Sequence, residues 1–146
     1  MVWTNLGKQR MFESWFSASA GPAIFTMVAS TSSTGTFNAD LSSTSQVTLV
    51  TSGNGYEPSG FTIERLGVDF VVSRDDTSDY ANAALRTGYQ LSANGGIISN
   101  VHYFLLANDN ADETNREVYA FWSTGSDLDI GDGNAVNITQ ANLRGT

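Results

Sequence analysis

The chain of 146 residues carries 15 acidic and 7 basic side chains, which give it a formal net charge of −8, and it contains no cysteine. This balance argues against nucleic-acid binding, which needs a clustered basic face. The missing thiol excludes disulfides, thiolate metal sites and a cysteine nucleophile. No apolar run approaches the roughly 20 residues of a membrane span. We therefore expect one β-rich domain over residues 1–146 that has no membrane contact.

The first predicted element is an α-helix over about residues 5–17. Thr4 or Asn5 supplies the N-cap oxygen, and Pro22 follows the predicted end of the helix. The large apolar side chains fall on one side of a 3.6-residue period and should be buried within the subunit: Met11, Phe12, Trp15 and Phe16. We expect the helix to plug one end of a sandwich or barrel. In the alternative, the segment docks with Trp3 and Arg10 onto a neighbouring subunit.

Strand patterns and a dense turn signal follow the helix. Residues 23–30 are apolar on nearly both faces, which predicts a central strand, and residues 46–51 alternate as a second strand. The sequence SGNGYEPSG at residues 52–60 then predicts a loop, because Asn54-Gly55 is a favoured tight-turn pair and Pro58 ends any central ladder. The simpler interpretation of this loop is a plain connection. In the alternative, it is an exposed contact loop with Tyr56 as its anchor.

The second half of the chain predicts a series of short strands. They cover residues 61–72 with a break at Gly67, residues 80–91, residues 97–106, residues 117–122 and residues 135–143, and residues 123–133 read as turns. Seven to nine short strands at regular spacing favour an antiparallel β-sandwich or barrel, a jelly-roll-like order included.

Two acidic segments raise the question of a metal site. In DLDIGDG, counting an EF-hand loop from Asp127 places Gly131 and Asp132 where that loop needs an oxygen ligand and a glycine, so the spacing fails. A calcium site outside the EF-hand pattern stays open there and in the segment NDNADE, with Asp109, Asn110, Asp112 and Glu113. We predict solvated acidic turns and no bound metal, although calcium binding at an acidic loop stays open.

No pattern indicates catalysis. His102 is the only histidine, and no G-x-S-x-G elbow or phosphate-binding glycine loop accompanies it. A pair of carboxylates for glycoside hydrolysis stays open, because nothing in the sequence selects two of the 15 acids. We expect no enzyme activity and no cofactor. Trp15 and Trp122 read as core residues, whereas Trp3 and Tyr56 read as free aromatic residues.

Four blocks of the chain resemble, in their order and type, small structural proteins encoded among the virion genes of tailed bacteriophages and cyanophages. The blocks are WTNLGKQRMFESWF at residues 3–16, the strand at residues 23–30, GNGY at residues 53–56 and EVYAFWSTGSDLDIGDGNAVNI at residues 117–138. The resemblance implies a capsid cement or decoration protein on the virion surface that binds the major capsid protein as a dimer or trimer. It implies no cofactor and no nucleic-acid partner.

The interface residues that we predict for this role are Trp3, Arg10, Phe37 and Tyr56. The alternative is a tail component or a host-receptor or glycan-binding module of the virion, which the same resemblance and the free aromatic residues favour. A cell-wall hydrolase is the third hypothesis, and it rests only on His102 and unassigned carboxylates.

Overall fold

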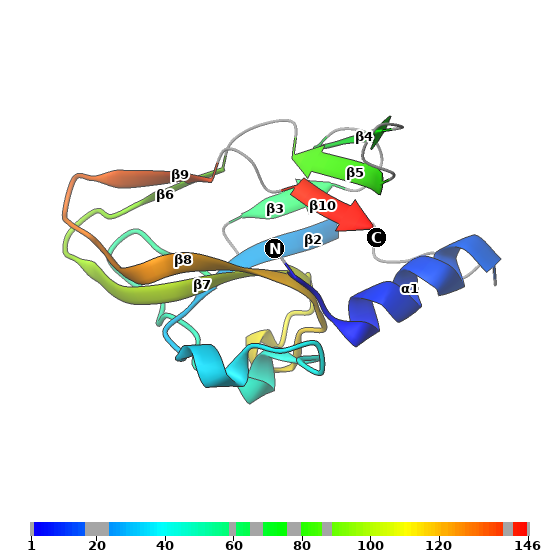
Figure 1. Ribbon diagram of the computed structural model, residues 1–146. Helices are drawn as coiled ribbons and strands as arrows, with labels where there is room; N and C mark the ends of the chain where they lie inside the picture. Colours follow the sequence, from blue (N-terminus) through cyan, green and yellow to red (C-terminus); the bar gives the residue numbers. More distant parts are fainter. Residues whose placement is uncertain are drawn as a thin grey trace.

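The computed structural model describes residues 2–16, 24–58, 61–64, 69–75, 80–85, 89–138 and 142–145. These residues form a mainly β, sandwich-like fold with one N-terminal α-helix, as predicted, and their strands do not close into a barrel (Figure 1). The helical elements are α1 (Asn5–Phe16), η1 (Thr34–Thr36), η2 (Thr44–Gln46) and η3 (Glu113–Asn115). The strands are β1 (Val2–Trp3), β2 (Ile24–Ser30), β3 (Thr62–Glu64), β4 (Phe70–Asp75), β5 (Tyr80–Leu85), β6 (Tyr89–Ser92), β7 (Ile98–Asn108), β8 (Val118–Ile130), β9 (Ala135–Ile138) and β10 (Asn142–Gly145).

The first layer is an antiparallel five-stranded sheet with the order β1-β8-β7-β2-β3. Strand β2 lies inside this sheet, between β7 and β3, and its residues from Thr26 to Ser30 are buried. The prediction of a central strand at residues 23–30 is confirmed. A strand with apolar side chains on both faces needs cover on both faces, and only an interior position supplies it.

The long hairpin of β7 and β8 corrects the prediction that residues 123–133 are turns. Strand β8 continues to Ile130, and only residues 131–134 turn back toward β9. Ile98 pairs with Ile130 and Val101 pairs with Leu128, so apolar side chains meet across the hairpin and hold its far end together. The Ser, Gly and Asp residues of this part of β8 lie on the exposed side of a strand and do not end it.

The second layer contains the two-stranded sheet β6-β9, and β10-β5-β4 form a separate three-stranded sheet. Ala84 of β5 pairs with Asn142 of β10. Tyr89 of β6, five residues after Ala84, pairs with Ile138 of β9, four residues before Asn142. The predicted strand at residues 80–91 corresponds to β5 and β6, and the predicted strand at residues 135–143 corresponds to β9 and β10. The described residues form ten strands. Gly67 lies outside the described residues.

Two core clusters occupy the two faces of the five-stranded sheet. One contains Met27, Val101 and Leu106 and extends to Val136 and Ile138 of β9, so it lies between the layers. The other contains Leu105 and Phe121 and is covered by the segment from residue 37 to residue 49.

The prediction of a strand at residues 46–51 is wrong, because this covering segment forms no regular strand. It contains η2 and two isolated bridges, from Ser43 to Glu117 and from Leu49 to Ser30. The Ser32 side chain accepts the Thr48 N–H at 2.7 Å. A hydroxyl thus takes a position that a backbone carbonyl would hold in a regular ladder, which keeps the segment from pairing as a strand.

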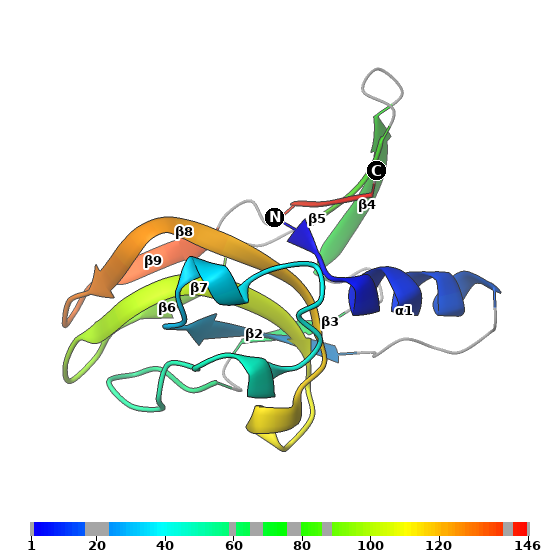
Figure 2. The same ribbon diagram turned by 60° about the horizontal axis from the view of Figure 1, so that its bottom comes forward.

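Helix α1 begins as predicted. Thr4 is its N-cap, because Thr4 Oγ1 accepts the Gly7 N–H at 2.9 Å. The helix contacts β8, and Figure 2 shows its second half leading away from the sheets. The side chains of residues 11–16 lie outside the described set, so the predicted burial of Met11, Phe12, Trp15 and Phe16 stays a prediction. None of the helices in the described part of the chain is long and apolar enough to cross a membrane.

Candidate functional site

The N-terminal segment uses both of its predicted interface residues inside the chain. Trp3 pairs with Ala120 in the sheet and packs, partly buried, against the core between the layers. Arg10 Nη2 lies 2.6 Å from Glu117 Oε1. Trp3 and Arg10 are therefore not free residues, and their contact with a neighbouring subunit stays a prediction. Because the first turns of α1 cross β8, a side chain on the apparently polar face of the helix reaches the sheet.

The Glu117 carboxylate joins α1 to β8. Its Oε1 pairs with Arg10, and its Oε2 accepts the Tyr119 hydroxyl at 2.7 Å. Burial raises the pKa of Tyr119, and the hydrogen bond to Glu117 raises it further, because ionising the phenol beside a carboxylate would place two negative charges together. These three side chains form a structural junction between α1 and β8.

Phe37 is also used inside the chain. Its ring stacks on Tyr103 with ring centroids 3.6 Å apart and planes 14° apart, and it also contacts Phe121. Phe37 therefore caps the outer core cluster and is not a free anchor for a partner. The sequence could not place it, because the segment that carries it has no regular strand or helix pattern.

The prediction that Tyr56 is an exposed aromatic residue is wrong. This residue is 1% exposed, and its hydroxyl accepts the backbone N–H of Ala29 at 2.8 Å. Burial raises its pKa to about 12. The phenol oxygen accepts the Ala29 N–H of β2 in the place of a carbonyl from a neighbouring strand, so Tyr56 satisfies a backbone donor of the sheet. The loop that carries it turns as predicted, since Asn54 and Gly55 both have positive φ, as a type I′ turn requires.

Arg116 is a buried cation that the sequence analysis did not single out. It is 2% exposed; its Nη1 donates to the Pro58 carbonyl at 2.8 Å and its Nε donates to the Asn110 carbonyl at 2.9 Å. Glu113 lies further away, with 3.8 Å between Oε1 and Nη2. The guanidinium thus holds two loops together. Its only sequence signal was a lone arginine directly before an apolar strand.

Three glycine-containing turns meet at one end of the molecule, and we call them the turn tip: residues 53–56, 93–97 and 131–134. The Asn94 N–H donates to the Asn54 carbonyl at 2.8 Å, and the Ala93 N–H donates to the Asn134 carbonyl at 2.9 Å. Asn54 Nδ2 donates to the Ile97 carbonyl at 2.7 Å. These bonds join turns that are far apart in the sequence into one rigid surface.

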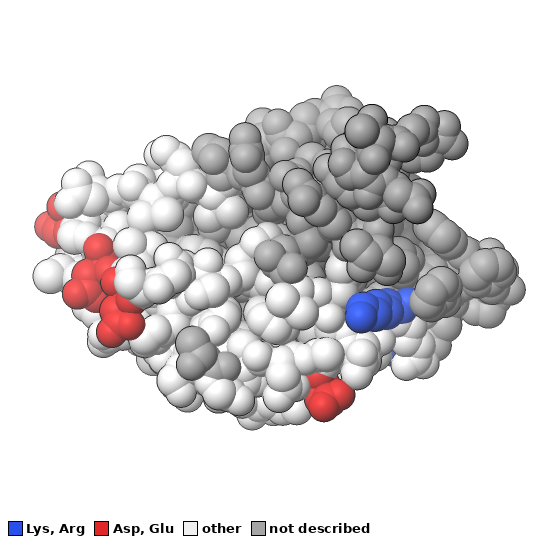
Figure 3. Space-filling view, viewed as in Figure 1, with Lys and Arg blue, Asp and Glu red and all other residues white. Residues whose placement is uncertain are grey.

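The turn tip and the strands beside it carry much of the acidic surface. Figure 3 shows acidic side chains gathered at this end, while the basic side chains visible in that view lie near α1. Asp132 Oδ1 accepts the Gly95 N–H, and Asp129 Oδ1 accepts the Asn100 N–H, both at 2.8 Å. Ile97 is 55% exposed here and is one of two large hydrophobic residues reported as exposed among those the structure describes.

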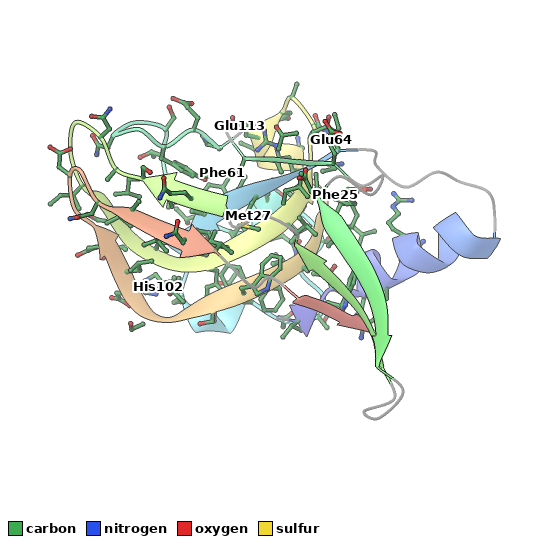
Figure 4. The ribbon with its side chains drawn as sticks, turned by 90° about the horizontal axis from the view of Figure 1, so that it is seen from above. Phe25, Met27, Phe61, Glu64, His102 and Glu113 are labelled. Atoms are coloured by element: carbon green, nitrogen blue, oxygen red, sulfur yellow. The ribbon has the colours of Figure 1, made fainter. Side chains whose placement is uncertain are left out.

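His102 and Asp127 meet at a bulge between β7 and β8. Tyr103 pairs with Ser123 and Val101 pairs with Leu128, so one residue of β7 lies opposite four residues of β8. His102 Nδ1 lies 3.2 Å from Asp127 Oδ1. Figure 4 shows His102 well apart from Glu113, so the histidine cannot act together with the acidic segment 109–113.

The acidic segments have structural roles in the described residues. Asp112 caps η3: its Oδ1 accepts the Thr114 N–H at 3.1 Å, and its hydrogen bonds to Thr114 and Asn115 lower the pKa of its carboxyl. Over the described ranges no group of three or more His, Asp and Glu side chains converges as metal ligands.

Comparison with known proteins adds no relative: no family model, no curated protein and no solved structure matches this chain.

Proposed function

We propose that this protein is a structural component of a bacteriophage virion, a capsid cement or decoration protein that binds the major capsid protein. The observation that carries the proposal is the ordered resemblance of residues 3–16, 23–30, 53–56 and 117–138 to virion proteins of tailed phages. The contacts of Arg10, Phe37 and Tyr56 within the chain support it indirectly, because they stabilise the fold and leave binding to a preformed surface.

The turn tip is the surface that we propose for capsid contact. It is held by hydrogen bonds between three separate turns, so binding would order little additional chain. A preorganised surface binds more tightly, because little conformational entropy is lost when the complex forms. Ile97 supplies an exposed apolar contact in the turn tip, and Asp132 and the nearby Asp129 add negative charge that suits a basic patch on the partner.

The copy number per particle tests the role. A cement protein should be present in purified virions at about one copy per capsid subunit, as closed shell symmetry repeats each contact. A handful of copies per particle would instead favour the tail or host-receptor alternative. Burial of Tyr56 removes one of the two aromatic residues that motivated glycan binding. Absence from the virion would reject both roles.

A substitution at the turn tip tests the surface. We expect Ile97→Asp to abolish binding to capsids assembled without the protein, because it places a charge within the contact. The matched control is Val2→Asp, which changes the other exposed large hydrophobic residue, 48% exposed, on β1. Co-sedimentation with the particles measures both. Equal binding by Ile97→Asp and the unsubstituted protein would move the contact elsewhere on the molecule.

A further inference from the structure

Two Asn-Gly pairs face each other within the turn tip. Asn54-Gly55 belongs to the first turn and Asn94-Gly95 to the second, and the Asn94 N–H donates to the Asn54 carbonyl. An asparagine before glycine is chemically labile, because a residue without a side chain lets its backbone nitrogen approach the preceding side-chain amide. The structure gives these two pairs different surroundings.

The Asn54 side chain is held away from the reaction. Its Nδ2 donates to the Ile97 carbonyl at 2.7 Å, and a Cβ built on Gly96 would lie only 2.6 Å from its Oδ1. The amide therefore packs closely against the backbone of residues 96–97. Swinging it toward the Gly55 nitrogen would break that hydrogen bond and leave the Ile97 carbonyl without this donor.

Asn94 is exposed, and the nitrogen that follows it already contacts a carboxylate. The Gly95 N–H donates to Asp132 Oδ1 at 2.8 Å. This hydrogen is the one that must leave before the Gly95 nitrogen can act as a nucleophile. A carboxylate placed on the proton to be removed is the arrangement of a general base.

We propose that Asn94 is a site of spontaneous deamidation, with Asp132 as the base. The Gly95 nitrogen bonds to Cγ of Asn94 while its proton passes to the Asp132 carboxylate. The side-chain nitrogen then takes up that proton and leaves as ammonia, and a cyclic imide remains. Water opens the imide at either carbonyl, which leaves aspartate or isoaspartate at residue 94. No oxidant, reductant or cofactor takes part.

The product changes the turn tip. Either product adds a negative charge near Asp132, and isoaspartate also lengthens the backbone inside the joined turns. The hydrogen bonds from Ala93 to Asn134 and from Asn94 to Asn54 depend on that backbone. The modification would therefore loosen this end of the sandwich as the protein ages, whatever the protein binds.

Peptide mapping by mass spectrometry tests the proposal on the full chain. After incubation at mildly alkaline pH and physiological temperature, we expect the mass gain of deamidation in the peptide that contains Asn94 and several-fold less in the peptide that contains Asn54. This comparison within one chain needs no variant. Equal or faster reaction at Asn54, or no reaction at Asn94, would overturn the assignment.

Variants test the role of the carboxylate. Asp132→Ser should slow the reaction at Asn94 several-fold, whereas Asp129→Ser, which removes an equivalent carboxylate bound to the Asn100 N–H, should leave the rate unchanged. Hydrogen exchange at Gly95 and Asn94 reports whether Asp132→Ser opens the turn. An unchanged or faster reaction in Asp132→Ser would show that Asp132 holds the turn and is not the base.

Discussion

At the scale of single residues, several backbone groups of this chain form hydrogen bonds with side chains where a regular sheet would pair them with other backbone groups. The Tyr56 hydroxyl completes the edge of β2, the Ser32 hydroxyl takes a backbone hydrogen bond from Thr48, and the Arg116 guanidinium holds two loop carbonyls. Each contact joins segments that are distant in sequence. Buried polar groups that lose such partners are costly, because water cannot replace them.

Replacing Tyr56 by Phe measures one such contact. The substitution keeps the ring but leaves the buried Ala29 N–H without its acceptor, so we expect a loss of about 1–3 kcal/mol in the free energy of unfolding. Urea denaturation followed by circular dichroism measures it. Tyr103→Phe is the matched control, because it also deletes a tyrosine hydroxyl in the core, and it should cost less. Equal losses would show that the Ala29 contact contributes nothing specific.

The same hydroxyl predicts a stability change at alkaline pH. Burial raises the pKa of Tyr56 from 10.0 to about 12, so the folded state keeps the proton to a higher pH than the unfolded state. The resulting stabilisation is complete below pH 10 and is lost as the pH rises toward 12. Tyr56→Phe should weaken this dependence, and Tyr119, whose pKa is also raised, should retain part of it. Tyrosinate absorbance that shows all five tyrosines of the folded chain ionising at pH 10 would contradict this.

At the scale of elements, the contact between α1 and β8 depends on a missing side chain. A Cβ on Gly7 would lie 2.3 Å from the Tyr119 carbonyl oxygen and 3.0 Å from the Trp3 ring. The helix backbone can therefore rest on the strand only with glycine at this position. Thr4 adds to the contact, since Thr4 Oγ1 donates to the Val118 carbonyl at 2.7 Å.

Gly7→Ala tests this close approach. Alanine favours a helix over glycine by about 1 kcal/mol, but the added Cβ would push α1 off β8, and we expect a net loss of about 1–3 kcal/mol in the free energy of unfolding. Gly35→Ala is the control, because nothing lies within 4 Å of its added Cβ. Thermal unfolding compares the two variants. A more stable Gly7→Ala variant would show that the helix does not rest on the strand as described.

At the scale of the whole molecule, β7 and β8 join the two core clusters. Val101 belongs to the cluster between the layers, while Leu105 belongs to the cluster under residues 37–49, and both are fully buried. A sheet with a core on each face should unfold as one unit, because neither cluster survives without the strands that carry both.

Val101→Ala and Leu105→Ala test whether the molecule unfolds in one cooperative transition. We expect the Leu105→Ala substitution to cost about 2–5 kcal/mol and the smaller Val101→Ala change to cost less, through the cavities that they leave. In each variant, tryptophan fluorescence and circular dichroism should report one common transition in urea. Two separate transitions in either variant would show that the clusters unfold independently.

The amino-acid sequence by itself determined the fold class, the central position of the strand at residues 23–30, a helix N-cap at Thr4 or Asn5 and the turn at Asn54-Gly55. These features depend on local periodicity and on backbone conformations that single residues favour. Only the tertiary structure decided that Tyr56 is buried, that Phe37 and Arg10 contact distant parts of the chain, that β8 extends to Ile130 and that three turns join at one tip. Those outcomes depend on pairing between residues far apart in the chain, and a local pattern carries no information about which distant segment will cover it.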